Sequence, residues 1–214
     1  LGTVVGVLAS VTIVTGSLIA LSQDGLKRRL AFSTISQLSY IVLGAALLSP
    51  RGLAGGLLHI AMHAFGKITL FFCAGAVFVA AGIKNVSEMK GLGRRMPVTM
   101  GAFFVGSLGV IGLPPAGGFL SKWSLLIGTL QAGQTGFLTV LLVSSLLNAA
   151  YFLPIVYNAF FAPSPQPFPE RLGEAPAWCL APIVATALCS LLLFFFPRPF
   201  DELARLAVAQ AFGG

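Results

Sequence analysis

The sequence predicts an all-α, polytopic membrane protein, a helix bundle of about seven transmembrane segments. Of its 214 residues, 57% are hydrophobic and only 9% are charged, whereas soluble domains are about a quarter charged. Apolar runs of about 20 residues, the length that spans a bilayer as a helix, recur along the chain. A spanning segment must satisfy its own backbone hydrogen bonds, and these runs are too uniformly apolar for alternating barrel strands. Helices are therefore expected throughout.

The apolar segments cover roughly 2–21, 31–49, 53–82, 97–113, 117–131, 135–161 and 177–196. The third is too long for one upright span, so it must tilt or leave the bilayer at its ends. "GLPPAGGF" predicts a broken helix near residues 112–118, because prolines and glycines cannot continue a regular helix. Discontinuous helices mark ion and substrate sites in transporters. The alternative is an ordinary turn between two helices.

The organisation expected from these segments has three parts. Residues 1–161 form a membrane transport domain, 162–176 an extended proline-rich loop, and 177–214 a final transmembrane helix with a short tail. The tail could form a short interfacial helix. Neither an initiator Met nor a basic region precedes the first apolar run, so we expect no cleaved signal peptide and a piece of a longer protein.

The formal net charge is +7, which is compatible with nucleic-acid binding. The charges, however, lie in short loops between apolar runs, as the positive-inside rule describes. Arg51 and Arg171 fall on one predicted side. Nine basic residues fall on the other: Lys27, Arg28, Arg29, Lys84, Lys90, Arg94, Arg95, Arg198 and Arg205. We therefore expect the nine-charge side in the cytoplasm, no nucleic-acid partner, and a multi-pass protein of a bacterial-type inner (plasma) membrane.

Two lysines, Lys67 and Lys122, lie inside apolar segments, where a lysine costs roughly 2.5–3.5 kcal/mol on insertion scales. Lys67 continues a row with His59 and His63, because helical positions four apart advance by only about 40°. Such a row suits a proton relay, since histidine titrates near neutrality. Two alternatives remain open for the histidines. They could bind a metal as an HxxxH pair, although no Glu follows the first His, or simply bond to neighbouring helices.

Lys122 lies in "GFLSKWSLL", just past the predicted break. It could extend to a membrane interface, but a lysine beside exposed backbone implies water inside the protein, with Ser121 and Ser124 able to hydrate it. Asp24 ends the first segment and could pair with Lys27 or Arg28, or lie among lipid headgroups. The second segment is unusually polar, which favours burial and bonding across helices; it carries Ser33, Thr34, Ser36, Gln37 and Ser39.

No cofactor, catalytic residue or metal site is expected. The chain has no Gly-rich phosphate loop, CxxC pair or nucleophile elbow. Its three cysteines, Cys73, Cys179 and Cys189, lie in apolar runs, where cysteine serves as a small hydrophobic residue.

Three blocks occur in order: "QDGLKRRLAFSTISQLSYIVLG", "HIAMHAFGKITLFFCAGA" and "MPVTMGAFFVGSLGVIGLPPAGGFLSKW". Together they resemble the proton-conducting antiporter-like family. It includes the D subunit of Mrp-type multisubunit cation/proton antiporters, the L, M and N subunits of NADH-quinone oxidoreductase, and related subunits of membrane hydrogenases. The resemblance implies two inverted repeats, each with a broken helix, of which this chain resembles the second.

In that family, the ion path of the second repeat uses basic residues that match His59, His63, Lys67 and Lys122 here. The essential Glu of the first repeat, with its partner Lys, has no counterpart in this chain. The family often has an acid at the position of Gly25, whereas here Asp24 stands one place earlier, and Phe32 replaces a frequent Tyr.

The leading hypothesis is a proton/cation-translocating subunit of a multisubunit antiporter, similar to the Mrp-type D subunit. Lys67 and Lys122 would be alternately protonated, with His59 and His63 connecting them to one aqueous side. Asp24, Lys27 and Ser121 are candidate supporting residues. The expected partners are other membrane subunits, the lipid bilayer and protons, with sodium an open alternative.

Three other functions remain open. The first is an L/M/N-type subunit that couples electron transfer to proton pumping, in an enzyme complex to which this chain contributes only transport. The second is a non-conducting structural subunit. The third is a metalloenzyme using His59 and His63.

Overall fold

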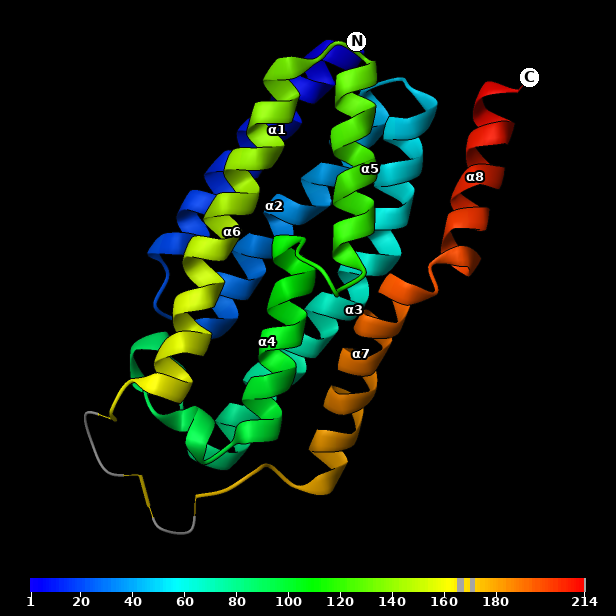
Figure 1. Cartoon of the computed structure of the whole chain (residues 1–214). Coiled ribbons are helices and arrows are strands. Elements are labelled where there is room, and N and C mark those ends of the chain that lie inside the picture. Colours follow the sequence, from blue (N-terminus) through cyan, green and yellow to red (C-terminus); the bar gives the residue numbers. More distant parts are fainter. Residues whose placement is uncertain (165–167, 170–171, 214) are drawn as a thin grey trace.

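The computed structural model describes residues 1–164, 168–169 and 172–213. This part of the chain contains eight α-helices and no β-strand, which confirms the predicted all-α bundle (Figure 1). Two short 3-10 helices, η1 (Val86–Met89) and η2 (Leu92–Arg94), follow the third helix. The α-helices are α1 (Gly2–Ser22), α2 (Leu26–Ala46), α3 (Pro50–Ala81), α4 (Pro97–Ile111), α5 (Gly118–Gln131), α6 (Thr135–Phe161), α7 (Ala177–Phe195) and α8 (Arg198–Phe212).

Among the described residues, α1, α3, α6 and α7 are each long and apolar enough to cross a membrane. The apolar helix α4 is shorter, and α5 follows it end to end, so that the pair runs the length of the bundle (Figure 1). The predicted break near residues 112–118 is therefore present. Gly112 ends α4 with φ +88° and donates from its N–H to the Leu108 carbonyl, a left-handed conformation that glycine adopts readily. The predicted segments 97–113 and 117–131 therefore form a single crossing together.

The side on which each loop lies follows from this arrangement. At one end, called the basic end below, the turn between α1 and α2 meets the loop after α3: the Leu26 N–H donates to the Lys84 carbonyl at 2.9 Å. From there α7 and α8 run one after the other toward the opposite end (Figure 1). Arg205 of α8 lines a pocket there with Arg51.

The expected grouping of Arg198 and Arg205 with the seven other basic residues is therefore wrong. The prediction from sequence treated α4 and α5 as two membrane crossings. It therefore placed the C-terminal tail on the wrong side of the membrane. Arg198 lies at the junction of α7 and α8, away from the basic end (Figure 1). Arg171, like part of the predicted loop 162–176, lies outside the described residues.

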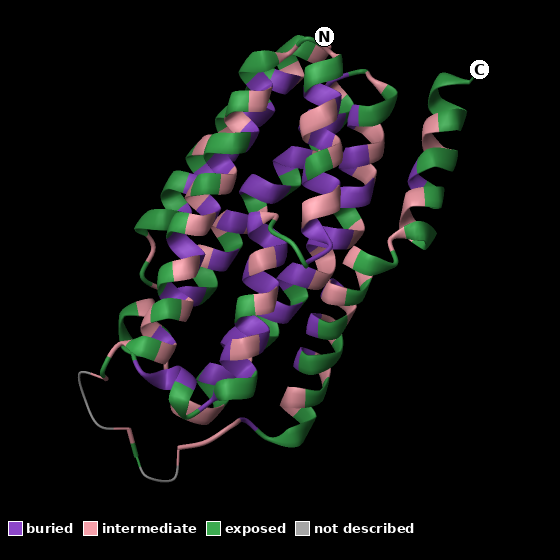
Figure 2. Cartoon of the chain, in the orientation of Figure 1, coloured by how far each residue is buried: buried purple, intermediate pink, exposed green. Residues whose placement is uncertain are grey.

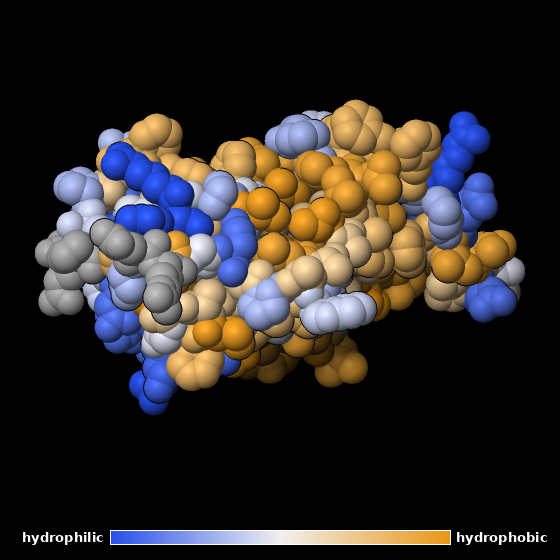
Figure 3. All heavy atoms as spheres, turned by 90° about the horizontal axis from the view of Figure 1, so that it is seen from below, coloured by the Kyte–Doolittle hydropathy of each residue, from blue (hydrophilic) through white to orange (hydrophobic). Residues whose placement is uncertain are grey.

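Helix α3 is the central helix and packs against α2, α4, α5, α7 and α8. Glycines allow its backbone to approach α5 closely: a Cβ on Gly55 would lie 2.8 Å from the Leu125 nitrogen. Small residues commonly play this role in membrane bundles. Buried residues line the inward faces of the helices (Figure 2). In the view from below, hydrophobic residues fill the middle of the visible face and hydrophilic residues lie at its two sides (Figure 3).

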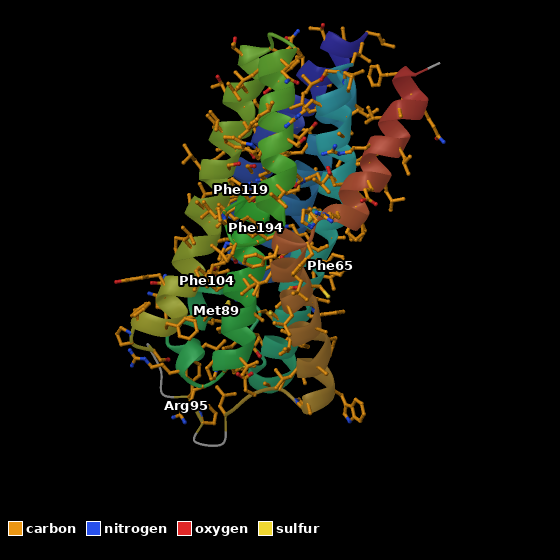
Figure 4. All side chains as sticks on the ribbon, turned by 45° about the vertical axis from the view of Figure 1, so that its right-hand side comes forward. Phe65, Met89, Arg95, Phe104, Phe119 and Phe194 are labelled. Carbon is orange, nitrogen blue, oxygen red and sulfur yellow. The ribbon has the colours of Figure 1, made fainter. Side chains whose placement is uncertain are left out.

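Helix α7 packs against the second part of the break between α4 and α5. The Gly117 N–H donates to the Ser190 carbonyl of α7 at 2.9 Å. One helical turn after Ser190, the ring of Phe194 lies 6.1 Å from the ring of Phe119, measured between centroids (Figure 4). Ala116, Gly117 and Gly118 of the break are thereby buried against protein, whereas Leu113, Pro114 and Pro115 are exposed.

Ser33, Ser36 and Gln37 bond across helices as expected. Thr34 and Ser39 instead donate to carbonyls of their own helix, α2. The Ser17 hydroxyl lies 2.9 Å from those of both Ser36 and Ser144. Ser33, Ser36 and Gln37 are fully buried. The polar character of the second segment is thus directed into the bundle.

Glu174 holds the start of α4, and replacing it should destabilise the fold. Its carboxylate accepts hydrogen bonds from the Val98 N–H at 2.5 Å, the Thr99 N–H at 3.3 Å and the Thr99 hydroxyl at 2.6 Å. Loss of a comparable helix cap costs about 1–2 kcal/mol. We expect Glu174→Ala to lower the thermal unfolding midpoint of the detergent-solubilised protein. Glu202→Ala, at an exposed position of α8, is the control, and equal midpoints would contradict the prediction.

Candidate functional site

His59, His63 and Lys67 all lie on the buried side of α3. Their exposed fractions are 1%, 6% and 5%. The two imidazole rings stack with 5.4 Å between centroids and 20° between planes. The spacing of four residues therefore produces one continuous row of basic groups in the interior of the bundle.

Lys122 lies in the first turn and a half of α5 and is equally buried, at 5% exposure. Its Nζ donates to the Ile111 carbonyl at 3.1 Å and to the Ser145 hydroxyl at 3.3 Å. Ile111 is the last residue of α4, where the helix dipole places partial negative charge. The broken helix thus supplies a carbonyl group directly to the lysine. The Tyr40 ring lies 4.8 Å from the same Nζ and adds a cation–π contact.

His59 connects this lysine to the row on α3 in two ways. Its Nδ1 lies 2.8 Å from the Ser121 hydroxyl, next to Lys122 in the chain. Its ring also stacks on Tyr40, the aromatic residue beneath the Lys122 ammonium, with 5.5 Å between centroids. On its other side, Nε2 lies 3.0 Å from Oε1 of Gln37. Both ring nitrogens therefore have partners, and the tautomer determines which of them donates.

Lys67 forms the other end of the row. Its Nζ donates to the Leu30 carbonyl at 3.1 Å and to the Ser33 hydroxyl at 2.7 Å. The Tyr151 hydroxyl of α6 donates to Ser33 at 2.9 Å and also contacts Oδ1 of Asn148. Hydrogen bonds thereby connect Lys67 of α3 directly to α2, and Ser33 connects it further to Tyr151 of α6.

His63 lies between His59, on which its ring stacks, and Lys67, one helical turn further along α3. Neither of its ring nitrogens has a partner within the described protein, nor do Nε2 of Gln37 and Nδ2 of Asn148, although all are buried. Buried polar groups are nearly always hydrogen-bonded, to water where protein is lacking. The row thus contains free donors and acceptors at its centre. Along α3 the histidines lie between Lys67 and the contact of His59 with Ser121. Whether they connect the lysines to one aqueous side stays a prediction.

Three expected neighbours of the row lie elsewhere. Asp24 is at the surface of the basic end, where it accepts from the N–H and hydroxyl of Ser87 at 3.0 and 2.7 Å. Of the two alternatives for Asp24, the pair with Lys27 or Arg28 is not formed, because the one ion pair among the described residues joins Arg205 and Asp201. Lys27 is exposed. The Ser124 hydroxyl donates to a backbone carbonyl of α3 at 3.4 Å, not to Lys122.

Sequence reasoning missed five residues that contact the two lysines or their partners: Tyr40, Ser145, Phe152, Asn148 and Tyr151. A signal existed for the last two, which stand three apart in an apolar run and so share one helix face. Nothing in the pattern indicated that this face would lie opposite Lys67. In the described ranges, no three His, Cys, Asp or Glu side chains gather closely enough to hold a metal ion.

Residues 2–148 match the family described as NADH:quinone oxidoreductase/Mrp antiporter, transmembrane. The chain belongs to this family. The antiporter-like chain is 43% identical over 204 residues to NADH-quinone oxidoreductase subunit N of Desulforudis audaxviator, covering 90% of this chain and 41% of that protein. It is 30% identical to the probable K⁺/H⁺ antiporter A/B subunit of Rhizobium meliloti, covering 97% and 22%.

A solved structure of the Mrp complex from Dietzia sp. DQ12-45-1b contains a similar chain. The two chains superpose with a TM-score of 0.89 and share 27% sequence identity. The match covers 97% of the present chain and 47% of the chain in the Mrp complex. The antiporter-like chain thus spans less than half the length of these relatives. Both branches that the sequence suggested, antiporter and oxidoreductase, are represented among them, and the recognised resemblance is confirmed.

Proposed function

We propose that this chain forms part of a proton path in an antiporter-like membrane subunit. The path runs through Lys122, His59, His63 and Lys67, with Ser121 in support. The observation that carries the proposal is the buried row itself, in which stacked imidazoles connect two lysines that have no acidic partner among the described residues. Asp24 and Lys27, at the surface of the basic end, are outside this path.

The contacts of the row suggest how it works. Lys122 is stabilised by the Ile111 carbonyl and Lys67 by the Leu30 carbonyl, so each lysine has a place where its ammonium form is bound. Two ammonium groups in one interior repel each other. A proton arriving at one lysine therefore favours release from the other. His63, with free ring nitrogens, is the group that can accept and return the proton between them.

The complete protein would be one subunit of a multisubunit membrane complex, with protons as cargo and sodium as the alternative coupled ion. The basic end carries Lys27, Arg28, Arg29, Lys84, Lys90, Arg94 and Arg95, which favours a cytoplasmic location for it in a bacterial-type inner membrane. An ion gradient would drive an Mrp-type antiporter, and electron transfer in partner subunits an oxidoreductase. The second assignment is supported by the 43% identity to an oxidoreductase subunit N.

The genes beside the coding region test the choice between these branches. Genes for small antiporter subunits would support the first assignment. Genes for a quinone-reducing arm would support the second.

Replacing His63 tests the path. In the full-length protein in proteoliposomes, His63→Leu should lower proton flux by at least about tenfold, because a barrier increase of about 1.4 kcal/mol suffices for that. The leucine removes two unbonded ring nitrogens and leaves the fold's other hydrogen bonds intact. Leu58→Met, at a buried position on the same helix, is the control. Wild-type flux in His63→Leu would contradict a path through this row.

A further inference from the structure

A second group of basic residues surrounds a surface pocket at the basic end and includes none of the residues of the proposed proton path. The pocket has a volume of about 480 Å³ and lies between the α1–α2 turn, the last turns of α3 and the residues that follow α3. Lys27, Arg28 and Lys84 line it, with Phe78 and Ala74 contributing apolar surface. None of these side chains contacts the row of lysines and histidines.

The pocket has an excess of positive charge that the described protein does not neutralise. The Nζ atoms of Lys27 and Lys84 lie 5.4 and 5.3 Å from the centroid of one ring, that of Phe78. The acid in the pocket, Asp24, uses both carboxylate oxygens to accept from Ser87. None of the three basic side chains forms an ion pair within the described ranges. Like charges gathered in this way repel, and an anion between them would relieve the repulsion.

An apolar strip leads from the pocket along the outer face of α3. Phe71, Gly75 and Phe78 share one helix face by their spacing. Phe71 is 37% and Phe78 is 42% exposed, and a Cβ placed on Gly75 would meet no atom within 4 Å. There is thus room for a hydrocarbon chain beside Gly75, between the two rings.

We propose that this pocket binds the headgroup of an anionic phospholipid. The lipid phosphate would lie between Lys27, Arg28 and Lys84, and one acyl chain would follow the strip over Gly75. Basic pockets between helices on the cytoplasmic side of a membrane bind such headgroups. A free phosphate would use the same cations but would leave the apolar strip without a ligand, which is why the strip favours a lipid.

The test measures binding of spin-labelled phosphatidylglycerol to the full-length, delipidated protein in neutral detergent. The double variant Lys27→Gln with Lys84→Gln should lower the affinity about tenfold or more, because two cations near the phosphate are lost. Lys90→Gln with Arg95→Gln is the matched control. It removes the same charge from exposed positions at the same end but outside the pocket, and should change the affinity less than about twofold.

A second variant separates the lipid from a free anion. Gly75→Leu fills the space beside α3 and keeps every charge, so it should weaken binding of phosphatidylglycerol without changing that of inorganic phosphate. Phosphatidylcholine binding as tightly as phosphatidylglycerol would overturn the proposal, as would equal losses in the two double variants. Displacement of the lipid by equimolar inorganic phosphate would assign the site to the free anion instead. None of these results depends on proton flux, so they are independent of the proposed function.

Discussion

Proton flux through the full-length protein should fall about 100-fold or more when either buried lysine is replaced by alanine. A positioned proton-transfer group contributes roughly 10²–10⁴ to a rate, and the row offers no second basic group at either end. Lys67→Ala removes the group bound to Leu30 and Ser33, and Lys122→Ala removes the one bound to Ile111 and Ser145. Flux into proteoliposomes, driven by an imposed gradient and followed with a pH-sensitive dye, measures the effect.

The control for both lysine variants is Lys90→Ala, which removes a basic side chain from the exposed loop after α3. It should leave flux unchanged. Assembly with the partner subunits must be compared at the same time, because an alanine beside orphaned carbonyl groups could loosen the bundle. Normal assembly with unchanged flux in both lysine variants would support the rival interpretation, a structural subunit that does not conduct.

Gly118→Ala should destabilise the protein strongly, although it adds only one methyl group. A Cβ at Gly118 would overlap the carbonyl oxygen of Gly109 in α4, and backbone atoms cannot move aside as the end of a flexible side chain can. Overpacking of this kind costs typically 1–3 kcal/mol. Helix α5 would have to shift away from α4, which would also take Lys122 from the Ile111 carbonyl.

The matched control is Gly101→Ala on α4, where a Cβ would meet no atom within 4 Å. Alanine is the better helix former, so this variant should be neutral or more stable by up to about 1 kcal/mol. Thermal unfolding of both purified variants in the same detergent gives the comparison. If Gly118→Ala unfolds at the temperature of Gly101→Ala, the close packing of α4 against α5 is not what holds the break.

The residues of the candidate row could be chosen from the sequence because each is an exception to a strong rule. A lysine in an apolar run stands out against the cost of burying charge, and histidines four residues apart on a helix must share its face. The break was equally visible, since Pro114, Pro115 and their glycine neighbours exclude a regular helix. Local rules sufficed for these features.

The remaining features depend on how helices distant in the chain meet. The Tyr40 ring stacks on His59 and contacts Lys122 because α2, α3 and α5 converge there, and no spacing within one helix predicts that. The side of the tail was assigned wrongly for a related reason. Composition shows that a helix is interrupted, but only the arrangement in space shows that its two halves make one crossing.

The lysine beside the break is bound to one half-helix and covalently part of the other. Its ammonium group takes a carbonyl from the end of α4, while its backbone belongs to α5. Any small rotation of one half against the other would therefore change the local field at this charge. Under the proposed function, such a joint would convert a small movement of one half-helix into a change in how firmly a proton is held at Lys122.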